Sequence, residues 1–325
     1  MKRVFSGIQP SGEPHLGNYA GALLNWVRLQ ADYECIYCVV DYHAITQSYD
    51  AELLAARTLD MATAILAAGV DPQRATLFVQ SAVPEHTELA WLLNCVTPLG
   101  ELERMTQFKD KAARDRKNIN VGLLAYPVLQ AADIALYRGE LVPVGEDQVQ
   151  HLELAREILR RFNARYGEVF PEPQPLLSTA KRILGLDGQA KMSKSLGNTL
   201  AVLADAEEIW DKLRPAVTDA RRVRRSDPGE PEDCNIFTMH KAFTGEAKRD
   251  ELAAGCRSAG IGCFDCKRVL ADAIDAQLAP VRERYRELAA RPERVREVLA
   301  AGATRCRGIA REVLAEARAA MGLLR

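Results

Sequence analysis

Apolar residues in the first half of the chain follow two alternating periods. Short apolar runs at residues 4–8, 35–40, 75–80 and 141–144 are typical of buried strands. Between these runs, at residues 18–30, 51–68, 84–96 and 147–166, apolar residues recur at helical spacing. The alternation predicts an α/β fold, a Rossmann-like doubly wound parallel sheet covered by helices on both faces. Ligands of such a sheet bind beyond the carboxyl ends of its strands.

The strand pattern stops near residue 204, and the rest of the chain is typical of helices. We therefore predict an α/β domain over residues 1–203 and a helical domain over 204–325, whose last helix could pack back on the first domain. Residues 221–225 predict an exposed basic loop. Between Arg282 and Arg325, eleven Arg or Lys stand against six Asp or Glu, which favours a solvated helical face.

The composition limits the class of protein but does not indicate a function. The 325 residues are 48% hydrophobic and 27% charged, which is ordinary for a globular protein. We expect a cytoplasmic protein without a membrane partner, because no apolar run could cross a bilayer and the N-terminus lacks a signal-peptide pattern. The net charge of −1 gives no global indication of nucleic-acid binding.

A loop rich in glycine and proline, residues 6–18, joins the first predicted strand to the first helix. Unpaired backbone N–H groups and the helix dipole make such a junction an anion site. The spacing matches neither GxGxxG nor a Walker loop. His15 and Asn18 offer donors to phosphate or ribose oxygens, and Gly17 lets a ligand approach the backbone.

A second loop, Lys191-Met192-Ser193-Lys194-Ser195, is bracketed by Gly185, Gly188 and Gly197. Two lysines three positions apart indicate a mobile cationic loop that could close over polyphosphate. A basic turn without function is the alternative for this pentapeptide alone. The first loop, about 175 residues upstream, makes that alternative weak, because two independent matches would both have to be accidental.

Together, His15-Leu16-Gly17-Asn18 and Lys191-Met192-Ser193-Lys194-Ser195 resemble the HIGH and KMSKS signatures of class I aminoacyl-tRNA synthetases. His15 stands where the family often has Thr. Four further strings resemble the tryptophanyl-tRNA synthetases: GIQPSG at 7–12, GELERMTQFK at 100–109, AADI at 131–134 and VPVGEDQ at 142–148. The resemblance covers nearly the whole chain and is weaker in the helical part. Two alternatives are a tyrosyl-tRNA synthetase and a non-ligating regulator that senses tryptophan or iron and binds RNA.

The resemblance implies that a homodimer attaches L-tryptophan to tRNA(Trp) through a tryptophanyl-adenylate, using ATP and Mg²⁺. No dedicated carboxylate cage for magnesium stands out in the sequence. The resemblance also implies catalytic roles for His15, Lys191 and Lys194, and an anticodon-binding role for the helical domain. The implied ATP contacts are Gln9, Pro10, Ser11, Gly17, Asn18, Gly145, Glu146, Asp147, Ile183, Lys191, Met192, Ser193, Lys194 and Ser195.

Asp133 lies in an apolar stretch, where an ionised carboxylate needs a donor. A helix N-cap or an ion pair with Arg138 is one interpretation. The resemblance implies instead that it accepts the indole N–H of tryptophan, which would reject analogues without this group. The other implied tryptophan contacts are Phe5, His43, Tyr126, Val142, Val144 and Gln148, although His43 is equally well interpreted as an ordinary residue at the end of a strand.

Four of the eight cysteines, Cys234, Cys256, Cys263 and Cys266, follow a C-x21-C-x6-C-x2-C pattern among glycines. The other four, Cys35, Cys38, Cys95 and Cys306, are interpreted as buried small hydrophobes. Structural zinc usually takes two close pairs of ligands, whereas irregular spacing suits an iron–sulfur cluster. A subgroup of tryptophanyl-tRNA synthetases carries a 4Fe–4S cluster on nearly this spacing, so the resemblance implies one here. Zinc, or no metal, are the alternatives.

Overall fold

The computed structural model describes residues 1–114, 119–145, 148–177, 183–193 and 196–324. Within these residues, five strands form one parallel sheet in the order β3-β2-β1-β4-β5. The strands are β1 (Arg3–Ile8), β2 (Glu34–Val39), β3 (Ala75–Val79), β4 (Leu141–Val144) and β5 (Gln174–Leu177). The predicted fold class is confirmed. The sequence pattern missed β5, whose Pro175 argues against a strand but is tolerated here because β5 lies at the sheet edge.

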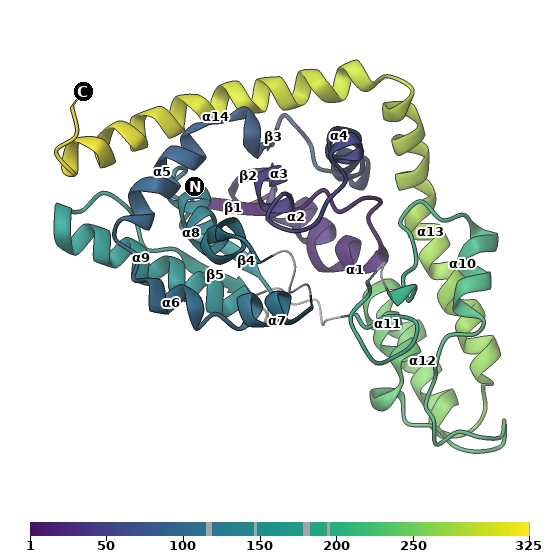
Figure 1. Cartoon of the computed structure of the whole chain (residues 1–325). Helices are drawn as coiled ribbons and strands as arrows, with labels where there is room; N and C mark the ends of the chain where they lie inside the picture. Colours follow the sequence, from purple (N-terminus) through teal and green to yellow (C-terminus); the bar gives the residue numbers. More distant parts are fainter. Residues whose placement is uncertain (115–118, 146–147, 178–182, 194–195, 325) are drawn as a thin grey trace.

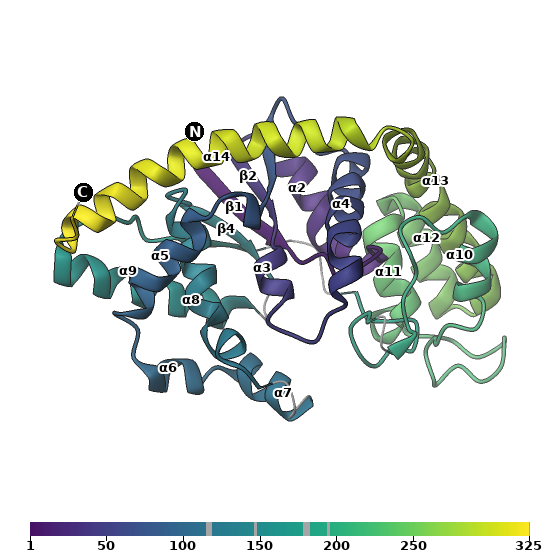
Figure 2. The same cartoon turned by 45° about the horizontal axis from the view of Figure 1, so that its top comes forward.

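Helices cover both faces of the sheet (Figures 1 and 2). Those of the α/β part are α1 (Leu16–Asn18), a π-helix (Tyr19–Leu23), α2 (Leu24–Leu29), α3 (Asp41–Ala44), α4 (Ala51–Ala68), a 3₁₀ turn (Gln80–Ala82), α5 (Glu85–Asn94), α6 (Leu99–Glu103), α7 (Thr106–Arg114), α8 (Val121–Ala135) and α9 (Val149–Tyr166). The later helices are α10 (Ala206–Leu213), a 3₁₀ turn (Pro231–Asp233), α11 (Asn235–Phe243), α12 (Glu246–Arg257), α13 (Cys263–Ala289) and α14 (Pro292–Ala320). None of the described helices is both long and apolar enough to cross a membrane.

Two hydrophobic clusters lie on opposite faces of the sheet. One contains Leu23, Trp26 and Ile65, from the helices that follow β1 and β2. The other contains Leu89 and Ile158, from α5 and α9. The pattern did not predict α8, because the core surrounds most of this helix and leaves it without an alternation of apolar and polar positions.

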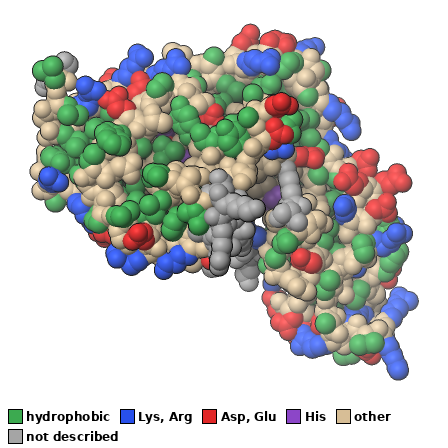
Figure 3. Space-filling view, viewed as in Figure 1, with side chains coloured by type: hydrophobic (Ala, Val, Ile, Leu, Met, Phe, Trp, Pro, Cys, Tyr) green, Lys and Arg blue, Asp and Glu red, His purple; other side chains and the backbone are tan. Residues whose placement is uncertain are grey.

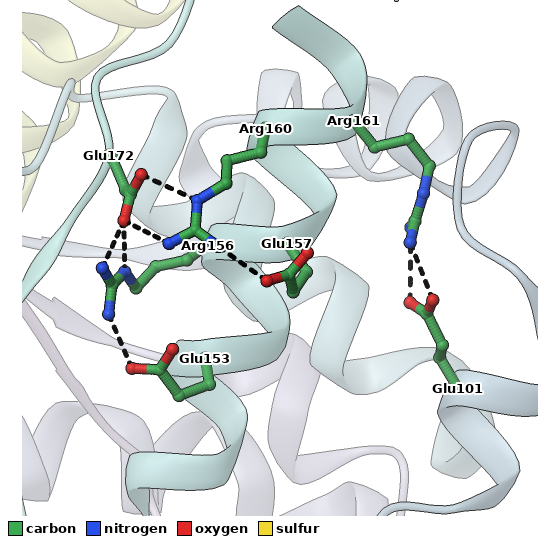
Figure 4. A network of polar contacts seen from close by, with 7 residues as sticks. All are labelled: Glu101, Glu153, Arg156, Glu157, Arg160, Arg161 and Glu172. Carbon is green, nitrogen blue, oxygen red and sulfur yellow. Dashed lines mark hydrogen bonds and ion pairs between the residues drawn. The ribbon is translucent and has the colours of Figure 1, made fainter. Parts of the chain in front are cut away.

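An ion-pair network ties α9 to the loop before β5 and to α6. Glu172 accepts hydrogen bonds from Arg156 Nε at 2.7 Å and Arg160 Nε at 2.8 Å, and Arg161 Nη2 lies 2.7 Å from Glu101 Oε1 (Figure 4). The hydrogen bonds from Arg160 and Arg156 lower the pKa of Glu172 to about 2. Because these groups face solvent, the network orients the loop more than it stabilises the fold.

The helical part, α10 to α13, projects from one side of the α/β part (Figure 1). Lys and Arg side chains gather at its far tip (Figure 3). The basic segment 221–225 is not helical and is mostly exposed, as predicted.

Helix α14 leaves this helical part and runs back across the sheet to the far side of the α/β part (Figure 2). It packs on β3, α4 and α5. Its arginines are mostly exposed, as the sequence suggested, and several of them also contact the α/β part. Arg311 pairs with Glu85 at 3.0 Å, Arg318 pairs with Glu88, and Arg307 Nε donates to the Ala82 carbonyl at 2.7 Å. The basic face of α14 is therefore solvated and at the same time joins the helix to the α/β part.

Gly302 makes the closest approach of α14 to the sheet. A Cβ at this position would lie 2.0 Å from the Leu77 carbonyl oxygen of β3, whereas a Cβ at Gly308 in the same helix would meet nothing within 4 Å. We expect Gly302→Ala to lower the free energy of unfolding by about 3 kcal/mol, because rigid backbone must move. Gly308→Ala should raise it by about 0.5–1 kcal/mol through helix propensity. Urea denaturation of both variants checks this, and equal effects would contradict the close approach.

Candidate active site

The two signature loops, nearly 180 residues apart in sequence, lie side by side. Leu16 N donates to Leu200 O at 2.8 Å, and Val202 N donates to Pro14 O at 2.9 Å. Between them, His15 and Ala201 form an antiparallel β-bridge. The loop of the first signature is therefore paired, through its backbone, with the strand-like segment that follows the second signature.

The second loop also packs against the start of the first helix. Met192 is buried at 4% exposure, and its Cβ would lie 3.5 Å from a Cβ at Gly17. The His15 ring lies against the same glycine, since that Cβ would come within 3.0 Å of the ring atoms. A Cβ at position 17 would crowd the His15 ring and touch Met192 at an ordinary van der Waals distance, so glycine suits this position and a longer side chain has little room.

Asn198 organises the backbone of the second loop. Its Oδ1 accepts from Ser193 N at 2.8 Å, and its Nδ2 donates to Asp187 Oδ2 at 2.9 Å and to Lys191 O at 3.3 Å. A Cβ at Gly185 would lie only 2.1 Å from Asn198 Nδ2. The hydrogen bond from Asn198 and those from backbone N–H groups lower the pKa of Asp187. Asn198 thus holds the cationic loop against the α/β part.

The first loop is arranged as expected at a helix start. Asn18 Oδ1 accepts from His15 N at 3.2 Å, which caps α1, and Ser11 N donates to Gln9 O at 2.9 Å. Pro10 is buried, whereas Ser11 is exposed. The helix begins at Leu16, two residues before the predicted start, because this cap precedes it.

Other predicted nucleotide contacts fall partly outside the described residues. Ile183 is buried at 7% exposure, and Gly145 O accepts from Gln148 N at 3.0 Å at the start of α9. Lys191 is exposed. The predicted site residues Glu146, Asp147, Lys194 and Ser195 lie outside the described residues.

Three polar side chains converge on Asp133, which lies within α8 and is 1% exposed. His43 Nε2 lies 2.7 Å from Asp133 Oδ2. Gln80 Nε2 donates to Oδ1 at 2.7 Å, and His86 Nδ1 lies 2.6 Å from the same oxygen. His43 and Gln80 follow β2 and β3, so the carboxyl ends of two strands supply polar partners to a carboxylate on a neighbouring helix.

The Asp133 carboxylate is ionised. Burial by itself would raise its pKa, but His43 and His86, through charge and hydrogen bonds, more than offset that effect and hold the pKa well below its usual range. The simpler interpretations of this residue are wrong. Asp133 is not an N-cap, because α8 begins at Val121, and Arg138 pairs instead with Glu316 at 2.5 Å.

The predicted apolar walls are buried around this carboxylate. Phe5, Tyr126, Val142 and Val144 are 4–7% exposed. The Tyr126 ring meets the His43 ring edge-on at 6.3 Å, and its hydroxyl lies 2.6 Å from His151 Nε2. Sequence reasoning missed Gln80, His86 and Asn198. Gln80 could have been found, since it is the last residue of a predicted strand.

Cys234 precedes α11, Cys256 lies near the end of α12, and Cys263 and Cys266 lie at the start of α13, so the four come together within the helical part. Burial first, and then repulsion from the other three thiolates, raise the pKa of Cys266 to about 12. Arg222 Nη1 lies 3.9 Å from Cys256 Sγ, and His240 Nε2 lies 3.4 Å from Cys266 Sγ. Across the part of the chain that the structure describes, no three His, Cys, Asp or Glu side chains are arranged to hold a single metal ion.

The remaining cysteines follow the sequence interpretation with one exception. Cys35 and Cys38 lie in β2, with their side chains in the clusters on opposite faces of the sheet, and Cys306 is buried in α14. Cys95 is exposed, contrary to the prediction, because it caps the C-terminus of α5 at the surface.

A parallel sheet whose strand ends carry a paired glycine-rich loop and cationic loop defines a class I aminoacyl-tRNA synthetase. The family model "tRNA synthetases class I (W and Y)" matches residues 1–279. The chain belongs to this family. It is 52% identical to the tryptophan–tRNA ligase of Deinococcus radiodurans, over 100% of both chains.

Solved structures agree with this assignment. Tryptophanyl-tRNA synthetase from Campylobacter jejuni, complexed with ADP and tryptophan, is similar with a TM-score of 0.86 and 39% identity, over 99% of this chain and 100% of that one. Tyrosyl-tRNA synthetase from Archaeoglobus fulgidus is less similar, with a TM-score of 0.71 and 27% identity, over 87% of this chain and 90% of that one. Among these relatives, the similarity is greater to the tryptophan enzymes.

Proposed function

We propose that the paired loops and the Asp133 pocket carry out the ATP-dependent attachment of L-tryptophan to tRNA(Trp). The single observation that carries the proposal is the backbone pairing of the first signature loop with residues 200–202, the segment that follows the second signature. The identity of the reaction rests on relatives that match the whole chain and are tryptophan–tRNA ligases.

The first step needs positioning more than proton transfer. The tryptophan carboxylate is already a nucleophile, so it can attack the α-phosphate of ATP and release pyrophosphate without a general base. We assign stabilisation of the departing pyrophosphate to Lys191 and Lys194, and ATP contacts to the 9–18 loop with His15. In the second step, a hydroxyl of the terminal tRNA ribose attacks the adenylate carbonyl, and AMP leaves.

ATP is the expected nucleotide, in keeping with the ADP of the Campylobacter jejuni complex. Mg²⁺ would arrive with ATP, since magnesium usually keeps several waters and is shared with substrate phosphates. The residues Ile183, Met192, Ser193 and Gly145 are proposed to border the nucleotide.

We assign recognition of the indole to Asp133. Its Oδ2 accepts from His43, and a carboxylate oxygen has two lone pairs, so Oδ2 can accept a second hydrogen bond. An ionised carboxylate is an obligate acceptor, which matches an indole N–H. Phe5, Tyr126, Val142 and Val144 would form the apolar walls, and Gln148 would contact the other end of tryptophan.

Pyrophosphate exchange with each of the twenty amino acids tests this function. We expect exchange with tryptophan alone. Exchange driven by tyrosine would support the tyrosyl alternative, and an absence of exchange with every amino acid would favour the non-ligating regulator.

We further propose that Cys234, Cys256, Cys263 and Cys266 bind a 4Fe–4S cluster. The four thiols lie near one another, and Arg222 and Lys267 place positive charge beside them, which would balance the negative charge of a thiolate-ligated cluster. His240 Nε2 is placed to donate a hydrogen bond to Cys266, a contact of the kind that tunes such clusters. Zinc is the alternative occupant.

Protein purified without oxygen should be brown and contain iron and acid-labile sulfide in equal amounts. Cys266→Ser should abolish the colour and weaken tRNA charging much more than tryptophan-dependent pyrophosphate exchange, because the cysteines lie in the helical part that we propose binds the tRNA. Cys95→Ser, at an exposed cysteine outside the cluster, is the control and should change neither property. Colourless protein that holds one zinc per chain would overturn the cluster.

The domain division, the dimer and the cytoplasmic location remain proposals. The division at residues 203 and 204 agrees with the change from strands to helices. A homodimer is supported by two large apolar side chains exposed on neighbouring helices, Trp91 at 69% and Leu99 at 60%. The helical domain, with its basic tip, is proposed to bind the anticodon side of the tRNA.

A further inference from the structure

The Asp133 carboxylate is the end of a longer buried chain of polar groups. Beyond His86, the Tyr137 hydroxyl lies 2.7 Å from His86 Nε2. Cys306 of α14 is buried close to Tyr137. His86, Tyr137 and Cys306 are all 0% exposed, so none of these contacts is made through solvent.

The chemistry of the carboxylate sets the direction of its hydrogen bonds. An ionised carboxylate can only accept, so His43 Nε2 and His86 Nδ1 must both carry protons. The Tyr137 hydroxyl occupies the other nitrogen of the same ring, Nε2, so both nitrogens of His86 have a protein partner. Both histidines therefore donate to Asp133.

The apolar surroundings hold the two rings of this chain in place. The Tyr137 ring stacks on Phe5 at 5.5 Å with an interplanar angle of 13°, and His86 stacks on Phe78 at 5.8 Å. Because the rings are packed on both β1 and β3, rotation of His86 away from Asp133 would disturb the core.

We propose that His86 and Tyr137 are positioning residues that make Asp133 selective for a substrate N–H. Together with Gln80, they occupy Oδ1 and fix the rotation of the carboxylate, so that Oδ2 remains the oxygen available for the substrate. This proposal rests on the proposed role of Asp133 as the indole acceptor.

The test separates recognition of the N–H from general effects on the pocket. The probe is 3-benzothienylalanine, a tryptophan isostere in which sulfur replaces the indole N–H. The readout is the ratio of kcat/KM for tryptophan to kcat/KM for this probe, measured by pyrophosphate exchange. KM for ATP and the thermal midpoint are measured for each variant.

Tyr137→Phe removes one oxygen atom and should lower this ratio about 5- to 10-fold, mainly through KM for tryptophan, with KM for ATP unchanged. His86→Phe should lower it further. His86→Asn keeps an N–H near the position of Nδ1 and should recover a large part of the loss. Tyr166→Phe, at a partly exposed tyrosine that ends α9, is the matched control and should leave the ratio unchanged.

The outcomes distinguish the two proposals. A ratio within twofold of wild type in Tyr137→Phe and His86→Phe, combined with a collapsed ratio in Asp133→Asn, would overturn the positioning role and leave the Asp133 assignment intact. An unchanged ratio in Asp133→Asn would overturn both. A lower thermal midpoint with an unchanged ratio would show a purely structural role, which also overturns the proposal.

Discussion

Replacement of Lys194 by alanine is expected to lower the turnover of tryptophan-dependent pyrophosphate exchange about 10²- to 10³-fold, or about 3–4 kcal/mol at the transition state. Charge develops on pyrophosphate only as it leaves, so the lysine acts mainly in the transition state and tryptophan binding should change little. The neighbouring backbone is ordered on the side before Lys194, since Asn198 binds the backbone of Lys191 and Ser193.

Two further variants sharpen this prediction. Lys191→Ala should also reduce turnover, because the resemblance places both lysines at the polyphosphate. Lys248→Ala, at an exposed lysine on α12 that pairs with Glu251 at 2.8 Å, is the matched control and should keep wild-type activity. If turnover of Lys194→Ala stayed within about threefold of wild type, the assignment of the second loop would fail.

Asp133→Asn is expected to lower the kcat/KM for tryptophan about 10²- to 10³-fold and to reduce selection against phenylalanine and tyrosine. The amide keeps the shape of the carboxylate but replaces one acceptor oxygen with a donor, so the indole N–H or one of the protein donors loses its partner. The specificity constants of the three amino acids in pyrophosphate exchange provide the measurement.

The same substitution should reduce stability. Because the donors around Asp133 are buried, leaving them mismatched is expected to lower the free energy of unfolding by about 2–4 kcal/mol. Urea denaturation of Asp133→Asn measures this loss, and activity is then compared under conditions in which the variant remains folded. Unchanged ratios among the three amino acids would move the selectivity to another residue, with Gln148 the next candidate.

Much of the α/β part could be predicted because its signals are local. Four of the five strands appear as apolar runs, and the glycines and lysines of the two signature loops are visible in the printed sequence. The failures also have local causes. Pro175 hid β5, and the fully buried α8 carries no periodicity. Cys95 looked buried because its neighbours are apolar, although it ends a helix at the surface.

By itself, the sequence determined the kind of sheet, the two loops that carry the chemistry, and the four cysteines that share one region. These follow from periodicity, residue type and spacing, which report on neighbours along the chain. Only the tertiary structure decided that Leu16 pairs with Leu200, and that the partners of Asp133 come from α3, the 3₁₀ turn after β3, and α5. It also showed that exposed arginines of α14 contact the α/β part. Such contacts join residues that are tens to hundreds of positions apart, and they depend on how whole elements pack, which no local pattern records.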